Sequence, residues 1–374
     1  MFNKFLKLDW ILNFSVFLLS GIGLLALYSI SLSEVNEESL SIFGRQIIFF
    51  VAGLIILFIL SFTDYRYFRS HSKAIYFFML IILVMVLIIG TVVRGTTGWI
   101  SVGSLSVQPV ELVKILLILS LASFITKNMG ILNEVLRLVV SFILAGVAIF
   151  LVLRQPDFGS ALVLMIILIV MILLSGIKWK YLVGIFFLGI FTIIVGWFFL
   201  IDYQKNRLIN FIDPNNDPKG SGYNVIQSVV AVGSGGINGK GLGHGSQSQL
   251  NFLPENHTDF IFAVIVEEFG VWGSGAVLLL LFTIFYRMKK IAEVSADNFG
   301  YLIVIGSMGM FFAQVVINIG MNIGIMPVTG IPLVFLSYGG SSLISSFIIL
   351  GIINNIYLTG RATSKGKVES YEFN

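Results

Sequence analysis

The sequence predicts an all-α integral membrane protein with about ten transmembrane helices. Two features of the composition indicate this: 57% of the 374 residues are hydrophobic and only 11% are charged, whereas soluble domains carry about a quarter charged residues. Apolar runs of about 20 residues also recur along the chain, and a helix of this length crosses a bilayer. Length rules for soluble domains therefore do not apply, and we expect one polytopic domain over residues 1–374.

The first apolar run, residues 10–30, already has a full spanning length. No small-residue cleavage site follows it, so we interpret it as a retained first helix and not as a signal peptide. The other spans follow in chain order, each bounded by charged or turn-forming residues. They lie near residues 44–62, 74–93, 108–126, 136–153, 157–176, 180–201, 259–286, 299–322 and 333–357.

Lysine and arginine are distributed unevenly between the connecting segments. With the amino terminus inside, the cytoplasmic segments hold 15 of the 23 cations, the outward segments hold 7, and Lys114 lies within a span. Cytoplasmic loops of membrane proteins carry this excess of positive charge. Both termini are therefore expected in the cytoplasm, including a short tail at about 359–374. The long loop at about 202–258, between the seventh and eighth spans, faces outward, as does the loop carrying Trp99.

The composition also excludes several classes of function. The chain contains no cysteine, which excludes a disulfide framework, a zinc–thiolate site and a thiol nucleophile. The net charge of +4 is explained by the loop bias, so no nucleic-acid partner is expected. No HExxH pattern or other strong metal-ligand spacing is present, and no metal ligand is assigned.

One carboxylate stands where a polar run meets a long apolar run. Residues 255–258 (ENHT) are polar or charged, Asp259 follows, and the apolar run begins at Phe260. Aspartate at such a boundary is a common helix N-cap. At a membrane surface it could also act as a general base on a lipid-borne substrate. The residues alone leave both interpretations open.

The loop before this carboxylate is rich in glycine, with seven glycines in the thirteen residues 233–245. It is not a P-loop, because Ser234 and Gly241 stand where GxxxxGK[ST] requires Gly and Ser or Thr. A flexible hinge is one interpretation. The other is that backbone amides and Lys240 bind a pyrophosphate.

Two ionisable residues fall within the fourth span. Glu111 and Lys114 are i, i+3 neighbours and share a helix face. Isolated charges inside a membrane are costly, so they are expected to form an ion pair in the bundle interior or to line a cavity for a substrate head group.

Two outward turns carry further candidates. Trp99 follows Gly98, and it could belong to the aromatic belt of a membrane protein or stack on a sugar ring. The turn Arg154–Asp157 lies between the fifth and sixth spans. Its charges could form a surface pair that contributes little, or they could help to bind a diphosphate.

Taken in order, these motifs resemble the SEDS family of peptidoglycan polymerases, typified by RodA, FtsW and SpoVE. The resemblance covers about residues 10–358 and rests on five segments: 108–114 (QPVELVK), 155–157 (QPD), 257–263 (HTDFIFA), 267–270 (EEFG) and 337–342 (SYGGSS). The stretch 239–255 is similar to the RodA branch. The chain departs from the family pattern at Gly98, Val110 and Val334, where relatives often carry Arg, Ser and Pro.

The resemblance implies a membrane glycosyltransferase that polymerises lipid II into β-1,4-linked strands on the outer face of the cytoplasmic (inner) membrane, in which it would be a multi-pass protein. Asp259 matches the essential aspartate and would deprotonate the acceptor GlcNAc 4-hydroxyl as it attacks C1 of the donor MurNAc. The expected substrate-binding residues are Trp99, Glu111, Lys114, Arg45, Arg154, Gln155, Asp157, Lys240 and His257. Arg94 and Arg207 are further outward cations that could stabilise the departing undecaprenyl pyrophosphate. A divalent cation, Mg²⁺ or Mn²⁺, could assist, and no other cofactor is expected.

The implied partners are the lipid bilayer, lipid II with the lipid-linked glycan, and a class B penicillin-binding protein that crosslinks the product. Asn318, Gly320 and Gly324 are the expected docking face for that partner's membrane anchor. The alternatives are a lipid II flippase or transporter, an FtsW-like division polymerase, and a non-catalytic scaffold. A transporter needs an inward-open pathway, whereas the polar motifs here gather on the outer half.

Overall fold

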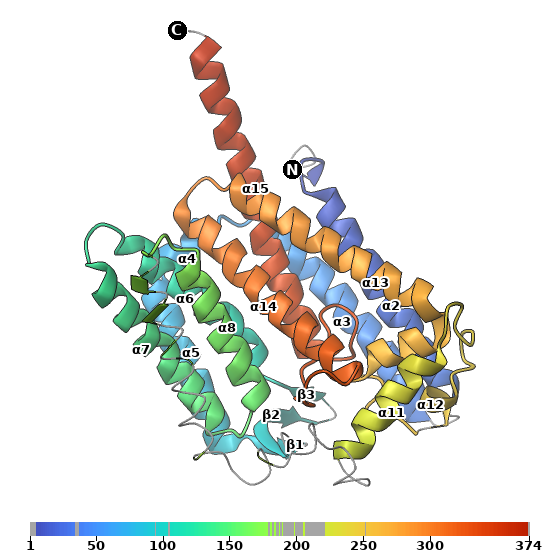
Figure 1. Ribbon diagram of the computed structural model, residues 1–374. Coiled ribbons are helices and arrows are strands. Elements are labelled where there is room, and N and C mark those ends of the chain that lie inside the picture. Colours follow the sequence, from blue (N-terminus) through green and yellow to red (C-terminus); the bar gives the residue numbers. More distant parts are fainter. Residues whose placement is uncertain are drawn as a thin grey trace.

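The computed structural model describes residues 5–33, 37–93, 95–103, 105–178, 221–250 and 252–372, with isolated positions between 180 and 205. It is a bundle of long helices (Figure 1), and the prediction of an all-α integral membrane protein is confirmed. Seven helices of the described residues are long and apolar enough to cross a membrane. In chain order the helices are α2 (Trp10–Ser33), α3 (Glu37–Ser61), α4 (Arg66–Ser70), α5 (Ser72–Ile89), α6 (Val110–Lys127), α7 (Glu134–Leu153), α8 (Phe158–Leu173), α11 (Ser221–Ser234), α12 (Ser246–Gln249), α13 (Ile261–Glu293), α14 (Asn298–Asn322) and α15 (Gly340–Glu372).

Nine of the ten expected spans overlap helices of the structure, and the remaining one, 180–201, lies mostly outside the described residues. The count of ten therefore stays a prediction. The last span was placed too early: residues 333–339 are not helical, and α15 begins at Gly340. α13 continues to Glu293 but is broken at Gly270, whose φ is 62°.

Local capping explains where several helices begin. The Asn133 side chain accepts a hydrogen bond from the Leu136 amide at 2.7 Å at the start of α7. Asp157 accepts from Ser160 N at 2.9 Å at the start of α8, and Asp297 accepts from Gly300 N at 2.8 Å at the start of α14. Each of these side chains satisfies an amide that the first turn leaves without a partner.

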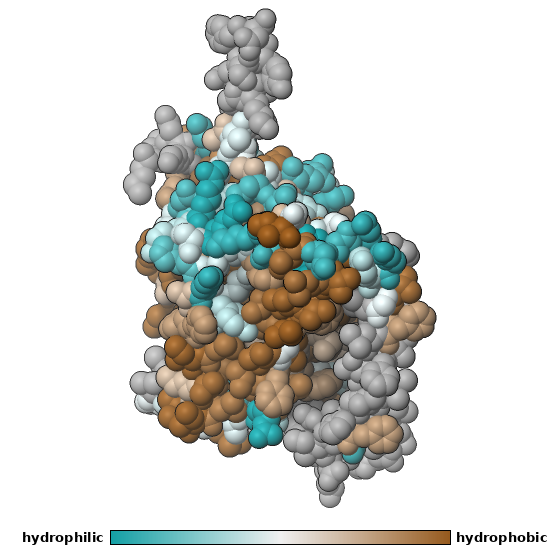
Figure 2. Space-filling view, turned by 90° about the vertical axis from the view of Figure 1, so that its left-hand side faces the viewer, coloured by the Kyte–Doolittle hydropathy of each residue, from teal (hydrophilic) through white to brown (hydrophobic). Residues whose placement is uncertain are grey.

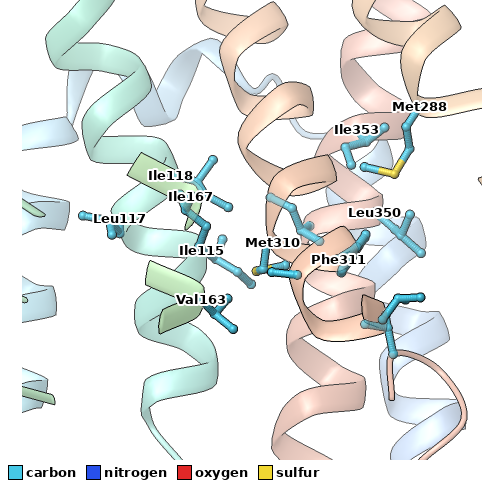
Figure 3. Close-up of a cluster of buried hydrophobic side chains, with 14 of the residues drawn as sticks. Ile115, Leu117, Ile118, Val163, Ile167, Met288, Met310, Phe311, Leu350 and Ile353 are labelled. Atoms are coloured by element: carbon cyan, nitrogen blue, oxygen red, sulfur yellow. The ribbon is translucent and has the colours of Figure 1, made fainter. Parts of the chain in front are cut away.

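α14 forms the centre of the bundle, where it packs against α6, α8, α13 and α15. Figure 3 shows its Met310 and Phe311 among apolar side chains of α6, α8 and α15. Two glycines of α14 allow a close approach of α8: a Cβ at Gly306 would lie 2.9 Å from Met171, and one at Gly309 would lie 3.0 Å from Val170. Small residues allow membrane helices to pack closely in this way.

A small antiparallel sheet joins α5 to α6 and was not predicted. It consists of β1 (Thr91–Val93), β2 (Thr96–Val102) and β3 (Leu105–Val107), in that order. Thr91 pairs with Trp99, and Ile100 pairs with Val107. The sheet lies with α12 and the starts of α13 and α15 at one end of the bundle, which we call the loop end, while the carboxyl-terminal part of α15 extends from the opposite end (Figure 1).

The surface has the apolar band that a membrane protein needs. Figure 2 shows hydrophobic residues over the middle and lower parts of one face and hydrophilic residues toward the end from which α15 extends. Phe77 and Ile81 of α5 and Ile143 and Phe150 of α7 are all more than half exposed. An apolar area of this extent suits contact with lipid, in keeping with a multi-pass membrane protein.

Candidate functional site

Asp259 is held in a tight turn directly before α13. The carbonyl of Glu255 accepts hydrogen bonds from the amides of Thr258 at 3.2 Å, Asp259 at 3.1 Å and Phe260 at 3.3 Å. Glu255 itself has a φ of 55°, in the left-handed region that a residue with a side chain rarely adopts. The N-cap position of α13 is Phe260, so Asp259 does not occupy the capping position. Asp259 is buried, with 7% of its surface exposed.

Two asparagines at the end of α14 bind the backbone of this turn. The Nδ2 atoms of Asn318 and Asn322 each donate to the carbonyl of Asp259 at 3.0 Å. Asn318 also donates to the carbonyl of Ile331 at 2.8 Å. Hydrogen bonds therefore join both the turn that carries Asp259 and the loop that connects α14 to α15 to the carboxyl-terminal end of α14.

That loop supplies a wall beside the Asp259 carboxylate. A Cβ at Gly330 would lie 3.7 Å from Asp259 Oδ2, and one at Gly159, in the first turn of α8, would lie 2.9 Å from the carbonyl of Thr329. The loop thus lies between α8 and Asp259. Gly330 is exposed, so the wall beside the carboxylate reaches the protein surface.

His257 connects the turn to the start of α15. Its carbonyl accepts from Tyr338 N at 2.9 Å, and its ring lies 5.8 Å from the ring of Tyr338. His257 Nε2 also lies 3.9 Å from a carboxylate oxygen of Glu255. Gln46 of α3 donates to the carbonyl of Ser337 at 3.1 Å, which places the amino-terminal part of α3, with half-buried Arg45, beside this segment.

Gln108 connects two more of the sequence motifs. Its amide N–H donates to Ser341 Oγ at 2.9 Å, and its Nε2 donates to Asp157 Oδ2 at 3.3 Å. Segments that are far apart in the sequence, around residues 108, 157, 257 and 341, therefore meet at the loop end.

The turn at Arg154–Asp157 supports the strand that carries Trp99. Thr97 N donates to the carbonyl of Gln155 at 3.2 Å, and a Cβ at Gly98 would lie 3.5 Å from Gln155 Oε1. Trp99 is half-buried on β2. Gln155 is buried, and Arg154 is exposed with its guanidinium 5.9 Å from the ring of Phe150. Asp157 caps α8 and is not paired with Arg154.

Glu111 and Lys114 form a buried ion pair. Lys114 Nζ lies 2.8 Å from Glu111 Oε1, with side chains 1% and 5% exposed respectively. The prediction that these residues contact one another is confirmed. Their pair lies in the first turns of α6, directly after Gln108.

Lys240 is engaged by a residue that the sequence analysis did not single out. Its Nζ lies 2.9 Å from Oε1 of Glu267, a side chain with no exposed surface. Glu267 also accepts from the amides of Gln247 at 2.9 Å and Ser248 at 3.1 Å. Glu267 is thus a structural partner of Lys240. The role of Lys240 in binding pyrophosphate stays a prediction.

The glycine-rich loop is packed onto α13 by its backbone. Lys240 N donates to the carbonyl of Glu267 at 3.0 Å, and Gly241 N donates to that of Glu268 at 2.9 Å. A Cβ at Gly239 would lie 2.1 Å from the Glu268 carbonyl. The glycines therefore permit close backbone contact at the place where α13 is broken.

The remaining candidates are the expected docking face, the cations Arg94 and Arg207, and a metal site. Asn318 has no exposed surface, and a Cβ at Gly320 would lie 2.9 Å from Met326. The expected docking face is therefore wrong for Asn318 and Gly320, because both are buried within the protein, whereas Gly324 is half-buried. Arg94 and Arg207 lie outside the described residues. No group of three or more His, Cys, Asp or Glu within the described ranges could hold a metal ion.

The residues that the sequence analysis missed have only weak signals in the sequence. Glu267 and Glu268 are adjacent acids in an apolar run, which marks a functional or structural site in a membrane protein. Asn318 and Asn322 are four residues apart and share a helix face, but nothing in the sequence says that this face turns toward Asp259.

Comparisons with known proteins agree with this arrangement. Residues 9–361 match the family model FTSW_RODA_SPOVE, described as cell cycle protein. The chain is 36% identical to the peptidoglycan glycosyltransferase MrdB of Escherichia coli K12, over 93% of this chain and 94% of that one. It resembles a chain of a peptidoglycan synthase complex that coordinates polymerization and crosslinking, with a TM-score of 0.79, 32% identity, and coverage of 94% and 98%. It also resembles the rod shape determining protein RodA of Thermus thermophilus, with a TM-score of 0.70, 29% identity, and coverage of 95% and 97%.

Proposed function

The chain belongs to the FtsW, RodA and SpoVE family of cell cycle proteins, and we propose that it polymerises lipid II with Asp259 as the general base. It is a peptidoglycan glycosyltransferase, like its relative MrdB, and its likeness to a rod shape determining protein suits elongation and shape maintenance. The named relatives do not favour the flippase or the division alternative. The β-1,4-linked strand would form on the outer face of the cytoplasmic membrane, at the loop end.

The observation that carries this proposal is the setting of Asp259. Its carboxylate lies in a turn that hydrogen bonds fix to α14, beside a wall that reaches the surface. In the proposed step, a carboxylate oxygen of Asp259 takes the proton of the GlcNAc 4-hydroxyl as that oxygen bonds to C1 of MurNAc. The bond from C1 to the pyrophosphate oxygen breaks, and undecaprenyl pyrophosphate leaves with the electron pair. A base must lie within hydrogen-bond reach of the proton that it removes.

The surrounding residues would bind the substrates. Half-buried Arg45 and exposed Arg154 are cations of the loop end that could stabilise the charge of the departing pyrophosphate. Half-buried Trp99 on β2 would stack on a sugar. The proposed binding roles of Glu111, Lys114, Gln155, Asp157, Lys240 and His257 rest on their place in the same motifs.

The proposed partner is a class B penicillin-binding protein. One relative of known structure belongs to a complex that coordinates polymerization with crosslinking. A chain with this fold would pass its glycan to a transpeptidase on the same side of the membrane.

The decisive experiment is polymerisation of labelled lipid II by purified Asp259→Asn protein. Asparagine keeps the shape of the side chain but cannot accept the proton, and loss of a general base costs about 10²- to 10⁴-fold in rate. The matched control is Asp297→Asn, which changes a carboxylate at the opposite end of the bundle and can keep the acceptor that caps α14. Wild-type rates in the Asp259→Asn protein would contradict the assignment.

A further inference from the structure

A side chain of α14 replaces a backbone hydrogen bond in the first turn of α13. In an α-helix the amide of residue 263 would donate to the carbonyl of residue 259. Here Ala263 N donates to Asn322 Oδ1 at 3.0 Å, and Asn322 Nδ2 donates to the Asp259 carbonyl at 3.0 Å. The carboxamide of Asn322 is thus inserted between the two backbone groups. It satisfies both of them while Asp259 stays outside the helix.

Asn318 performs a second task with one side chain. Its Nδ2 donates both to the carbonyl of Asp259 and to that of Ile331, at 3.0 and 2.8 Å. Ile331 follows Gly330, where a Cβ would lie 3.7 Å from Asp259 Oδ2. One planar amide therefore sets the separation between the segment that carries the carboxylate and the segment that faces it.

The two asparagines also support each other and are fully enclosed. Asn322 Nδ2 donates to the Asn318 carbonyl at 2.8 Å, and neither residue has exposed surface. Burying an amide is costly unless its hydrogen bonds are made. Apolar residues could pack α14 as tightly, but they could not direct two carbonyls to fixed positions.

We propose that Asn318 and Asn322 are positioning residues for Asp259: their carboxamides hold its backbone outside α13 and fix its carboxylate against the loop at Gly330. This inference rests on the proposed role of Asp259 as the base. The asparagines touch no substrate and act only through the position of residue 259.

The structure offers a matched control for removing a buried asparagine. Asn13 and Asn354 donate to each other's Oδ1 atoms between α2 and α15, at 3.3 and 2.9 Å, and both are buried. Within the described residues, their side-chain hydrogen bonds join α2 to α15 and do not involve the turn at Asp259. Asn354→Leu therefore removes a buried carboxamide, as Asn318→Leu does, but it leaves the turn that carries Asp259 unchanged.

The kinetic test measures kcat and KM for lipid II in three folded variants. Asn318→Leu removes both donations to carbonyls, and Asn322→Asp keeps the acceptor for Ala263 N but loses the donor to Asp259. Because a misplacement of about 1 Å can cost about 10²-fold in rate, we expect kcat to fall about 10- to 100-fold with KM changed by less than about threefold. Asn354→Leu should keep kcat within about twofold of the wild type.

Three outcomes of this experiment would overturn the proposal. The first is a wild-type kcat in both folded site variants. The second is an equal loss of kcat in Asn354→Leu. The third is failure of both site variants to fold while Asn354→Leu folds, since that would assign the asparagines a structural role alone.

A second measurement does not depend on activity. Since the chain has no cysteine, Asp259→Cys introduces a single thiol, and its alkylation rate reports how residue 259 is held. We expect Asn318→Leu to change this rate by about fivefold or more, and Asn354→Leu to leave it unchanged. An unchanged rate in the Asn318→Leu background would contradict the positioning role. If the rate changes but Asp259→Asn still polymerises lipid II, the positioning role stands and the assignment of the base fails.

Discussion

Three aspartates at the starts of helices show how far one residue type can differ in role. Asp157 and Asp297 accept amide hydrogens of their own first turns and stabilise α8 and α14. Asp259 occupies a similar place in the sequence, but Phe260 holds the N-cap position and Asn322 completes the first turn. A carboxylate that is not needed as a cap can serve chemistry, and this difference depends on α14.

At the same scale, the Glu111–Lys114 pair predicts an asymmetric response to mutation. Lys114→Met leaves the carboxylate of Glu111 buried without its partner, and breaking a buried pair costs about 3–5 kcal/mol. The double change Lys114→Met with Glu111→Leu should recover most of that stability, because no charge remains buried. Thermal unfolding in detergent measures both effects.

The control for this prediction is the exposed pair of Lys290 and Glu293, 3.3 Å apart. Lys290→Met should cost less than about 1 kcal/mol, because water already solvates both charges. If the double variant regains stability but not polymerisation, the buried pair also serves the substrate. Strictly additive losses at positions 111 and 114 would mean that the two charges are not coupled.

Among the elements, α13 is the one whose form depends most on distant parts of the chain. Gly270 has φ 62° and ψ −150°, which breaks the helix. The glycine-rich loop occupies the space beside the break, and Val271 N donates to the carbonyls of Gly236 and Ile237, both at 3.1 Å. The apolar run alone predicts one continuous span, and only the packed loop explains the break.

We therefore expect Gly270→Ala to destabilise the protein markedly. A Cβ at this position would lie 2.4 Å from the Ile237 carbonyl, and the positive φ disfavours any side chain. The loss should reach about 2 kcal/mol or more, and the loop should become more accessible to protease.

Gly275→Ala is the matched control on the same helix. A Cβ there would meet nothing within 4 Å, so alanine should stabilise α13 by up to about 1 kcal/mol. Equal effects of the two substitutions on the unfolding temperature would show that the break at Gly270 does not constrain the protein.

For the whole molecule, polar chemistry is concentrated at one end of an apolar bundle. The motifs around residues 108, 157, 257 and 341 meet there through hydrogen bonds between the starts of four helices, α6, α8, α13 and α15, or the turns before them. The opposite end carries α4 and the long extension of α15 (Figure 1). A glycosyltransferase with this layout would meet a lipid-linked sugar at one membrane surface.

The charge distribution predicts which surface this is. Ser106 on β3 lies at the loop end, and Ser70 is the last residue of α4, at the opposite end; both are exposed. In the cysteine-free chain, Ser106→Cys should react with an impermeant maleimide in intact cells whose outer membrane surface is accessible. Ser70→Cys should react only after permeabilisation, because the excess of Lys and Arg keeps its loop in the cytoplasm. The reverse pattern would contradict both the orientation and an outward-facing site.

Local sequence patterns were enough to predict the membrane class, the helices at nine of the ten expected spans and the motifs that meet at the candidate site. This is possible because a bilayer requires each span to satisfy its own backbone, so helices are encoded locally by apolar length. These patterns also identified the contact of Glu111 with Lys114, since that pair lies within one helix.

The other features depend on tertiary contacts, because they join residues that are far apart in the chain. Asn318 turns toward Asp259 and not toward lipid, Lys240 is paired with Glu267, and Gly270 breaks α13 against a distant loop. A side chain's type and spacing fix which helix face it occupies. Which neighbour that face meets depends on how the whole bundle buries its polar groups, where each must find a partner.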